Sequence, residues 1–109
     1  MTEIFESLAG LNKLIHEPAR LAILTALSAC ESADFLYLQR LTGLSKGNLS
    51  SHLSKLEEGG LIHIEKGFVG KKPQTIVSLT DNGRTAIETH WQQLDDLRQH
   101  AQNWQPAQA

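Results

Sequence analysis

The sequence has 109 residues, which is enough for one domain with its own core and too few for two independent ones. Hydrophobic residues make up 40% and charged residues 20%, a balance that excludes a disordered or fibrous chain. No apolar run reaches the roughly 18 residues of a membrane span, and the opening MTEIFESLAG lacks the features of a secretory signal. We therefore expect a cytoplasmic protein with no membrane partner.

Charge is unevenly distributed along the chain, although the formal net charge is only −2. Between Arg40 and Thr75 there are six basic and three acidic residues, which leaves +3, whereas the segments before and after sum to −3 and −2. A positive centre in a mildly acidic chain predicts a local contact with an anionic partner.

Helical spacing is present from the start of the chain. Apolar residues recur there at steps of four, three and four, at Ile4, Leu8, Leu11 and Ile15. This spacing predicts one amphipathic helix or two short ones, interrupted near Gly10. Pro18 suits the first turn of the next helix, and ARLAILTALSA is apolar nearly all round, so this helix is expected to be the buried centre of the domain.

The middle of the chain predicts two helices joined by a very tight turn. CESADF, residues 30–35, is typical of a loop. LYLQRLTG, residues 36–43, predicts a short helix in which Leu38 and Leu41 point inward and Gly43 supplies a left-handed end. Ser45 is expected to cap the following helix, which EEGG ends at residues 59–60.

A hairpin and a long helix are expected next. LIHIEK, residues 61–66, alternates apolar and polar positions and predicts a half-buried strand, and TIVSLT, residues 75–80, predicts the returning strand. GFVGKKPQ between them is expected to form the tip. Thr80 is expected to cap a final helix over residues 81–104.

The helix after Ser45 has two contrasting faces. Leu49, Leu53 and Leu56 fall on one side of a helical wheel and anchor the helix in the core. The other positions hold short polar side chains rather than the long ones of an ordinary solvated face: Gly47, Asn48, Ser50, Ser51, Ser54 and Lys55. Such a face fits into a groove and offers hydrogen bonds to phosphate oxygens and base edges.

This order of helix, tight turn, capped helix and hairpin is a winged helix-turn-helix. GNLSSHLSKLEEGG, residues 47–60, followed by LTDNGR, residues 79–84, resembles the small winged-helix transcriptional regulators of the ArsR and MarR types, and the likeness runs from about His16 to Leu97. The resemblance implies one domain over residues 1–109, mainly α with a small β-hairpin (α+β). Its winged helix-turn-helix core would span residues 16–80, with dimerisation helices at 1–15 and 81–104.

The resemblance also implies a sequence-specific regulator that binds double-stranded DNA as a homodimer. In such a dimer, the recognition helix, residues 45–58, would lie in the major groove, and the wing, residues 66–74, would lie on the DNA backbone. The DNA-binding positions carried over are Ser45, Lys46, Gly47, Asn48, Ser50, Ser51, Ser54 and Lys55 in the helix, and Lys66, Lys71 and Lys72 in the wing. Two adjacent lysines without an arginine predict phosphate contact at the tip rather than minor-groove reading.

Three polar residues around this helix have more than one interpretation. His52 lies at the border of the leucine face, where it either supports the structure or contacts phosphate. Arg40 either touches the DNA backbone or is a solvated or ion-paired arginine. Arg20 matches an arginine of the family's second helix and is expected to be mainly structural.

The final helix carries a seam with coiled-coil spacing, at Ile87, His90, Leu94, Leu97, Ala101 and Trp104, with Trp91 beside it. We expect it to form the dimer interface together with Ile4 and Leu8. The alternatives are that the helix packs back on its own domain, or that the two tryptophans and His90 line a pocket for a small-molecule effector.

Other functions are weighed against this hypothesis. The five histidines and the carboxylates show no metal-ligand spacing, and no nucleophile motif or phosphate loop is present, so neither catalysis nor a cofactor is expected. Cys30, the only cysteine, excludes an internal disulfide and the paired cysteines of ArsR-type metal sensors, and is expected to be buried. A metal site shared between subunits through Cys30, His90 or His100 stays open. So does a winged helix that binds protein, although the polar face and the +3 segment favour DNA.

Overall fold

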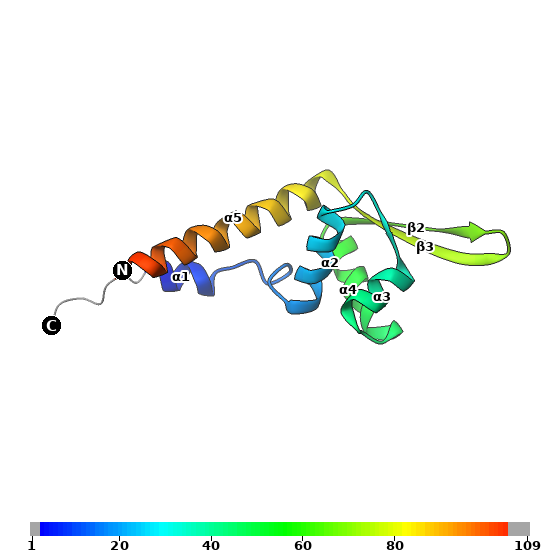
Figure 1. The fold of residues 1–109 in the computed structure, drawn as a ribbon, viewed down its shortest axis with the longest axis horizontal. Helices are drawn as coiled ribbons and strands as arrows, with labels where there is room; N and C mark the ends of the chain where they lie inside the picture. Colours follow the sequence, from blue (N-terminus) through cyan, green and yellow to red (C-terminus); the bar gives the residue numbers. More distant parts are fainter. Residues whose placement is uncertain (1–2, 105–109) are drawn as a thin grey trace.

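Helices dominate the part of the chain that this computed structural model describes, residues 3–104, with side chains from Phe5 onward. The helices are α1 (Glu3–Ala9), α2 (Pro18–Ser28), α3 (Phe35–Thr42), α4 (Lys46–Glu58) and α5 (Asp81–Asn103), and the strands are β1 (Ala33–Asp34), β2 (Ile62–Val69) and β3 (Lys72–Leu79). The expected mainly α fold with a small hairpin is confirmed (Figure 1).

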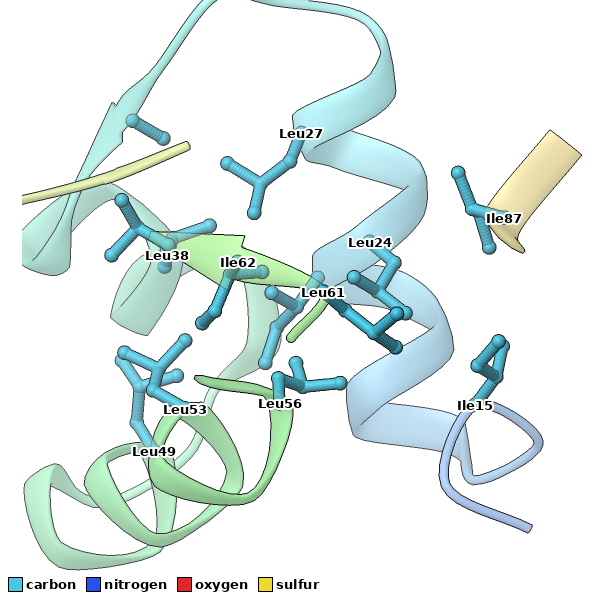
Figure 2. Packing of buried hydrophobic residues seen from close by; sticks show 13 residues of the cluster. Ile15, Leu24, Leu27, Leu38, Leu49, Leu53, Leu56, Leu61, Ile62 and Ile87 are labelled. Atoms are coloured by element: carbon cyan, nitrogen blue, oxygen red, sulfur yellow. The ribbon is translucent and has the colours of Figure 1, made fainter. Parts of the chain in front are cut away.

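The main hydrophobic core surrounds α2. On one side, Leu49 and Leu53 of α4 point toward Leu38 of α3, while Ile87 of α5 lies on the other side of α2 (Figure 2). Leu24 of α2 has no exposed surface, as predicted for a central helix. Burying one such side chain contributes about 1.5–3 kcal/mol, so this cluster is the principal source of stability.

The sheet has three antiparallel strands in the order β1-β3-β2. The ladder of β2 and β3 runs from the pair Ile62 and Leu79 to the pair Val69 and Lys72. The predicted tip over residues 67–74 was therefore too long, because an exposed hairpin forms its ladder without needing an alternating apolar face. The two-residue β1 was expected to be a loop, since so short a strand carries no readable period.

Three expectations about single side chains or segments were wrong. Leu41 is 47% exposed, because the eight-residue α3 lies at the edge of the core and turns only Leu38 fully inward. Cys30 is exposed, because it lies beyond the C-terminal cap of α2. The interruption expected near Gly10 is present, since α1 ends at Ala9, but Leu11 and Ile15 were expected on a helix and are instead buried from an irregular segment.

The molecule is elongated, with extents of 69 × 26 × 21 Å. Its radius of gyration is 17.1 Å, whereas a compact chain of this size has about 13 Å. The excess comes from two projections: the far half of the 23-residue α5 leaves the core with α1 beside it, and the β2–β3 hairpin extends at the opposite end (Figure 1). We call residues 15–87 the core unit, and residues 3–11 with 91–104 the arm.

Candidate nucleic-acid interface

A three-residue turn joins α3 to α4. Gly43 ends α3 in the left-handed conformation, with φ of 69°, and its N–H donates to the Gln39 carbonyl at 2.9 Å. The Ser45 hydroxyl then accepts the N–H of Asn48 at 3.1 Å and caps α4. The predicted turn and cap are both confirmed, and they fix the two helices in a helix-turn-helix arrangement.

α4 presents its polar face to solvent. Its buried residues are Leu49, Leu53 and Leu56, as the helical wheel predicted. All eight positions predicted for recognition are exposed: Ser45, Lys46, Gly47, Asn48, Ser50, Ser51, Ser54 and Lys55. Within residues 3–104, nothing covers this face, so it is available to a macromolecular partner.

A polar cluster fixes α4 against the start of α2. Arg20 Nη1 lies 3.0 Å from Nδ1 of His52, and Arg20 Nε donates to the Leu14 carbonyl at 2.6 Å. Because a guanidinium only donates, Nδ1 of His52 is the acceptor in this contact. Both residues are thus engaged with the protein itself, which supports the structural interpretation of each.

Glu17 completes this cluster. Its Oε2 accepts the Arg20 N–H at 2.8 Å, which caps α2, and lies 3.7 Å from Nδ1 of His52. Burial alone would raise the pKa of Glu17, but hydrogen bonds from the backbone N–H groups of Arg20 and Ala19, together with the positive charge of Arg20, outweigh it and lower the pKa. The carboxylate therefore stays ionised at the positive N-terminus of α2.

The wing carries three exposed lysines, and two of them, Lys66 and Lys72, lie on the side that α4 borders. Lys71 lies in the two-residue turn that it forms with Gly70, whose φ of 62° is left-handed. Lys72 pairs with Val69 in the last step of the ladder, whereas Lys66 pairs with Thr75 well before the tip. The tip therefore carries two of the three predicted wing lysines, and the third lies nearer the core unit.

A hollow of about 550 Å³ separates the wing from α4. Lys46, Ser50 and Ser54 border it on the helix side, and Lys66 and Lys72 border it on the wing side. Predicted residues from two elements about 20 positions apart in sequence thus face one concave surface. Asp34 is the single acidic residue among those that line it.

The sequence analysis missed the exposed apolar residues in and beside this hollow, of which Leu36 and Val69 line it and Phe68 does not. Phe68 and Val69 are 74% and 62% exposed at the end of the wing, and Leu36 of α3 is 57% exposed at the rim of the hollow. The sequence analysis assigned Phe68 and Val69 to the hairpin tip. Their exposure could therefore not be inferred from the alternating faces of a strand.

The predicted dimer interface is partly covered by its own chain. Ile87 is 1% exposed in the main core, His90 is 2% exposed, and Leu97 packs on Leu11. These three side chains thus follow the alternative in which the helix packs back on its own domain, because α2 and the segment after α1 lie against this side of α5. Their surfaces are not available to a partner while this packing holds.

The remaining interface positions leave surface for a partner. Leu8 and Trp91 are each 43% exposed, although the indole N–H of Trp91 donates to Oγ1 of Thr25 at 3.0 Å. Leu94 and Trp104 are half-buried in the small cluster of the arm, where Trp104 meets Phe5 edge-on. The Ile4 side chain lies outside the described residues.

A histidine pair joins α5 to the segment before α2. His16 Nδ1 and His90 Nε2 are 3.1 Å apart, so one ring carries a proton and donates it to the other. Burial and the neighbouring His16 lower the pKa of His90. The neutral form of His90 is therefore favoured.

Two further features bear on the class of protein. Among residues 3–104, no helix is long and apolar enough to cross a membrane. The same residues include no group of three or more histidine, cysteine or acidic side chains arranged to hold a metal ion.

The helix-turn-helix of α3 and α4, with its exposed serine-rich α4 beside a basic hairpin, defines a winged-helix nucleic-acid-binding protein. The model of the winged helix DNA-binding domain family matches residues 19–97. The chain belongs to this family, which confirms the resemblance seen in the sequence.

Individual relatives agree with this assignment. An uncharacterized protein of Methanocaldococcus jannaschii is 35% identical over 78 residues, 72% of this chain and 85% of its own length. The HTH-type transcriptional regulator YgaV of Escherichia coli is 38% identical over 61 residues, 56% of this chain and 62% of its own. A transcriptional regulator homologue from Pyrococcus horikoshii superposes with a TM-score of 0.80 at 29% identity, over 93% of this chain and 98% of its own. The family is one of DNA-binding transcriptional regulators and not of enzymes.

Proposed function

We propose that this protein is a cytoplasmic, homodimeric transcriptional regulator that binds double-stranded DNA sequence-specifically. In this proposal α4 enters the major groove and the wing lies on the neighbouring backbone. The observation that carries it is the polar face of α4, exposed along its whole length and bordered by the wing lysines. Short hydroxyl and amide side chains suit base edges and phosphates, and the lysines neutralise flanking phosphates.

Dimerisation is supported by the shape of the arm. α1 and the far half of α5 enclose a cluster of two buried residues, Leu11 and Leu97, and leave Phe5 and Leu8 about half exposed. A pair of helices with so small a core gains stability by burying its apolar side against a second copy. A two-fold axis there would also present two α4 helices to two half-sites on one face of a duplex.

Selection from a random library of duplexes tests DNA binding. The wild-type protein should enrich a two-fold symmetric sequence, and its affinity for that duplex should fall steeply with salt, with a slope of about −0.9 for each phosphate neutralised. Ser51→Glu and Lys55→Glu should each abolish binding, because they place negative charge on the groove-facing side of α4. Lys13→Glu, which makes the same charge change as Lys55→Glu at an exposed site outside the interface, is the matched control. Affinity that is insensitive to salt and to both α4 variants would reject DNA as the partner.

Sedimentation of the full chain tests the dimer. Leu8→Glu and Leu94→Glu should shift the protein from dimer to monomer, because each places a charge on the apolar side of the arm. Leu41→Glu, which changes a comparably exposed leucine of the core unit, should leave the dimer intact. A dimer that survives both arm variants would place the interface elsewhere.

A further inference from the structure

The end of the wing is apolar as well as basic. Phe68 is 74% exposed, the highest value among the large hydrophobic side chains described, and it lies directly across the ladder from Pro73. Val69, 62% exposed, follows it. The segment from Lys66 to Thr75 contains three lysines and no acidic residue. The end of the wing therefore combines an exposed aromatic side chain with three lysines, and the β2–β3 hairpin projects from the molecule at the end opposite the two termini (Figure 1).

The alternation of the strands sets the direction of this ring. Ile62, Ile64 and Phe68 occupy one face of β2, and Ile62 and Ile64 pack on the core. Phe68 and Pro73 therefore continue the core-facing side of the hairpin beyond the core. Pro73, the partner of Phe68 across the ladder, lines the hollow that Lys46 and Ser50 of α4 border, whereas Phe68 is not among its lining residues. Phe68 therefore lies beyond the hollow, at the end of the wing.

Such a residue is costly in water unless a partner covers it, because exposed apolar surface is unfavourable to hydrate. No other part of residues 3–104 covers Phe68. A partner that fits must offer apolar surface between negative charges. The minor groove does so, since sugar edges and base steps lie between two rows of phosphates, and apolar side chains of other proteins insert there as wedges.

We propose that Phe68, backed by Pro73, inserts into the minor groove beside each half-site while Lys71 and Lys72 hold the flanking phosphates. This inference rests on the proposed function. It keeps the phosphate contact predicted from the lysines, but it replaces the prediction that the tip does not read the minor groove. A wedge favours steps that unstack easily, above all pyrimidine–purine steps. The wing would thus contribute sequence preference at positions that α4 does not reach.

The test uses the duplex selected by the wild-type full chain, with 2-aminopurine placed at the flanking step. Wild-type protein should raise the fluorescence of the probe, because unstacking relieves its quenching. Phe68→Ala should remove this signal and the preference at that step, and should weaken binding by about tenfold with the salt slope unchanged. Lys72→Ala should instead lower the slope by about 0.9 per contact and act equally on all sequences. Leu41→Ala, an exposed apolar truncation away from the wing, is the matched control.

The outcomes separate the two proposals. Unchanged affinity, step preference and fluorescence for Phe68→Ala would overturn the wedge and leave the regulator intact, whereas a wild-type protein that enriches no duplex overturns both. A shift of free Phe68→Ala from dimer to monomer would assign the tip to a second copy and also overturn the wedge. Phe68→Leu should retain most of the affinity, and equal melting temperatures of the variants would show that the exposed site does not affect folding.

Discussion

The core unit and the arm share α5 but differ in how they bury it. At its start α5 contributes Ile87 to a cluster of 13 buried residues drawn from α2, α3, α4 and the sheet. Toward its end it contributes Leu97 to a cluster that contains one other buried residue, Leu11. The helix is continuous, and its two halves read as equally amphipathic in sequence. What differs is the number of elements available to cover each half.

This difference shows which region buries its own apolar surface without a partner. The core unit closes its own apolar surface, so α4 and the wing are held in fixed positions without a partner. The arm leaves Phe5, Leu8 and Trp91 about half exposed. A region that is helical but poorly covered is typical of an interface, and the contrast can be tested by substitutions in each region.

The largest effect is expected in the core unit. Leu24→Ala should lower the free energy of unfolding by about 2–5 kcal/mol, because it leaves a cavity at a fully enclosed position. Leu97→Ala in the arm should cost less than half as much at low protein concentration, since its surroundings can collapse, and should weaken the dimer. Urea titration measured at two protein concentrations checks both effects. Equal losses that do not depend on concentration would mean that the arm is as well packed as the core unit.

An intermediate effect is expected at the junction where α5 begins. A Cβ added at Gly83 would overlap the carbonyl group of Leu61, and this overlap explains the glycine of LTDNGR. Gly83→Ala should therefore push α5 outward and cost about 1–3 kcal/mol. Gly67→Ala is the control, because a Cβ there meets nothing within 4 Å. Thermal melting compares the two variants, and equal melting temperatures would contradict the close approach.

The smallest effect is expected from pH at the histidine pair that links the core unit to α5. Because burial and His16 lower the pKa of His90, the folded protein resists protonation that the unfolded chain accepts. Stability should therefore be full above about pH 6.5, the ordinary histidine value, and should fall as the pH drops toward the lowered pKa. His90→Gln should flatten this dependence between about pH 7 and 5, above the range in which Glu17 titrates. His63→Gln, at an exposed site on the wing, should retain it.

Local chemistry explains what could be predicted from the sequence. Gly43, Ser45 and Thr80 act through hydrogen bonds to residues within four positions, so the turn and the caps were predictable. The two faces of α4 followed from leucine spacing. By contrast, the His16–His90 contact joins residues 74 positions apart, and no pattern in the sequence brings them together.

The candidate site was predictable in its polar half. The serines and lysines of α4 that were predicted to face DNA could be placed on a helical wheel, and the structure exposes all of them. The apolar half, Phe68 and Val69, was hidden because glycine and proline nearby favoured a loop over a strand. Burial in the seam of α5 was also unpredictable, since the same spacing serves a partner helix or the chain's own α2.

The close contact between Gly83 and Leu61 also sets the direction of α5, and therefore the position of its far end. α5 is a straight rod of 23 residues, about 34 Å long at 1.5 Å per residue. A tilt of about 5° at its base would swing the opposite end by about 3 Å, close to the spacing of successive base pairs. In the proposed dimer, the close backbone contact between Gly83 of α5 and Leu61 before β2 would therefore keep the two recognition helices at a fixed separation that matches the helical repeat of the duplex.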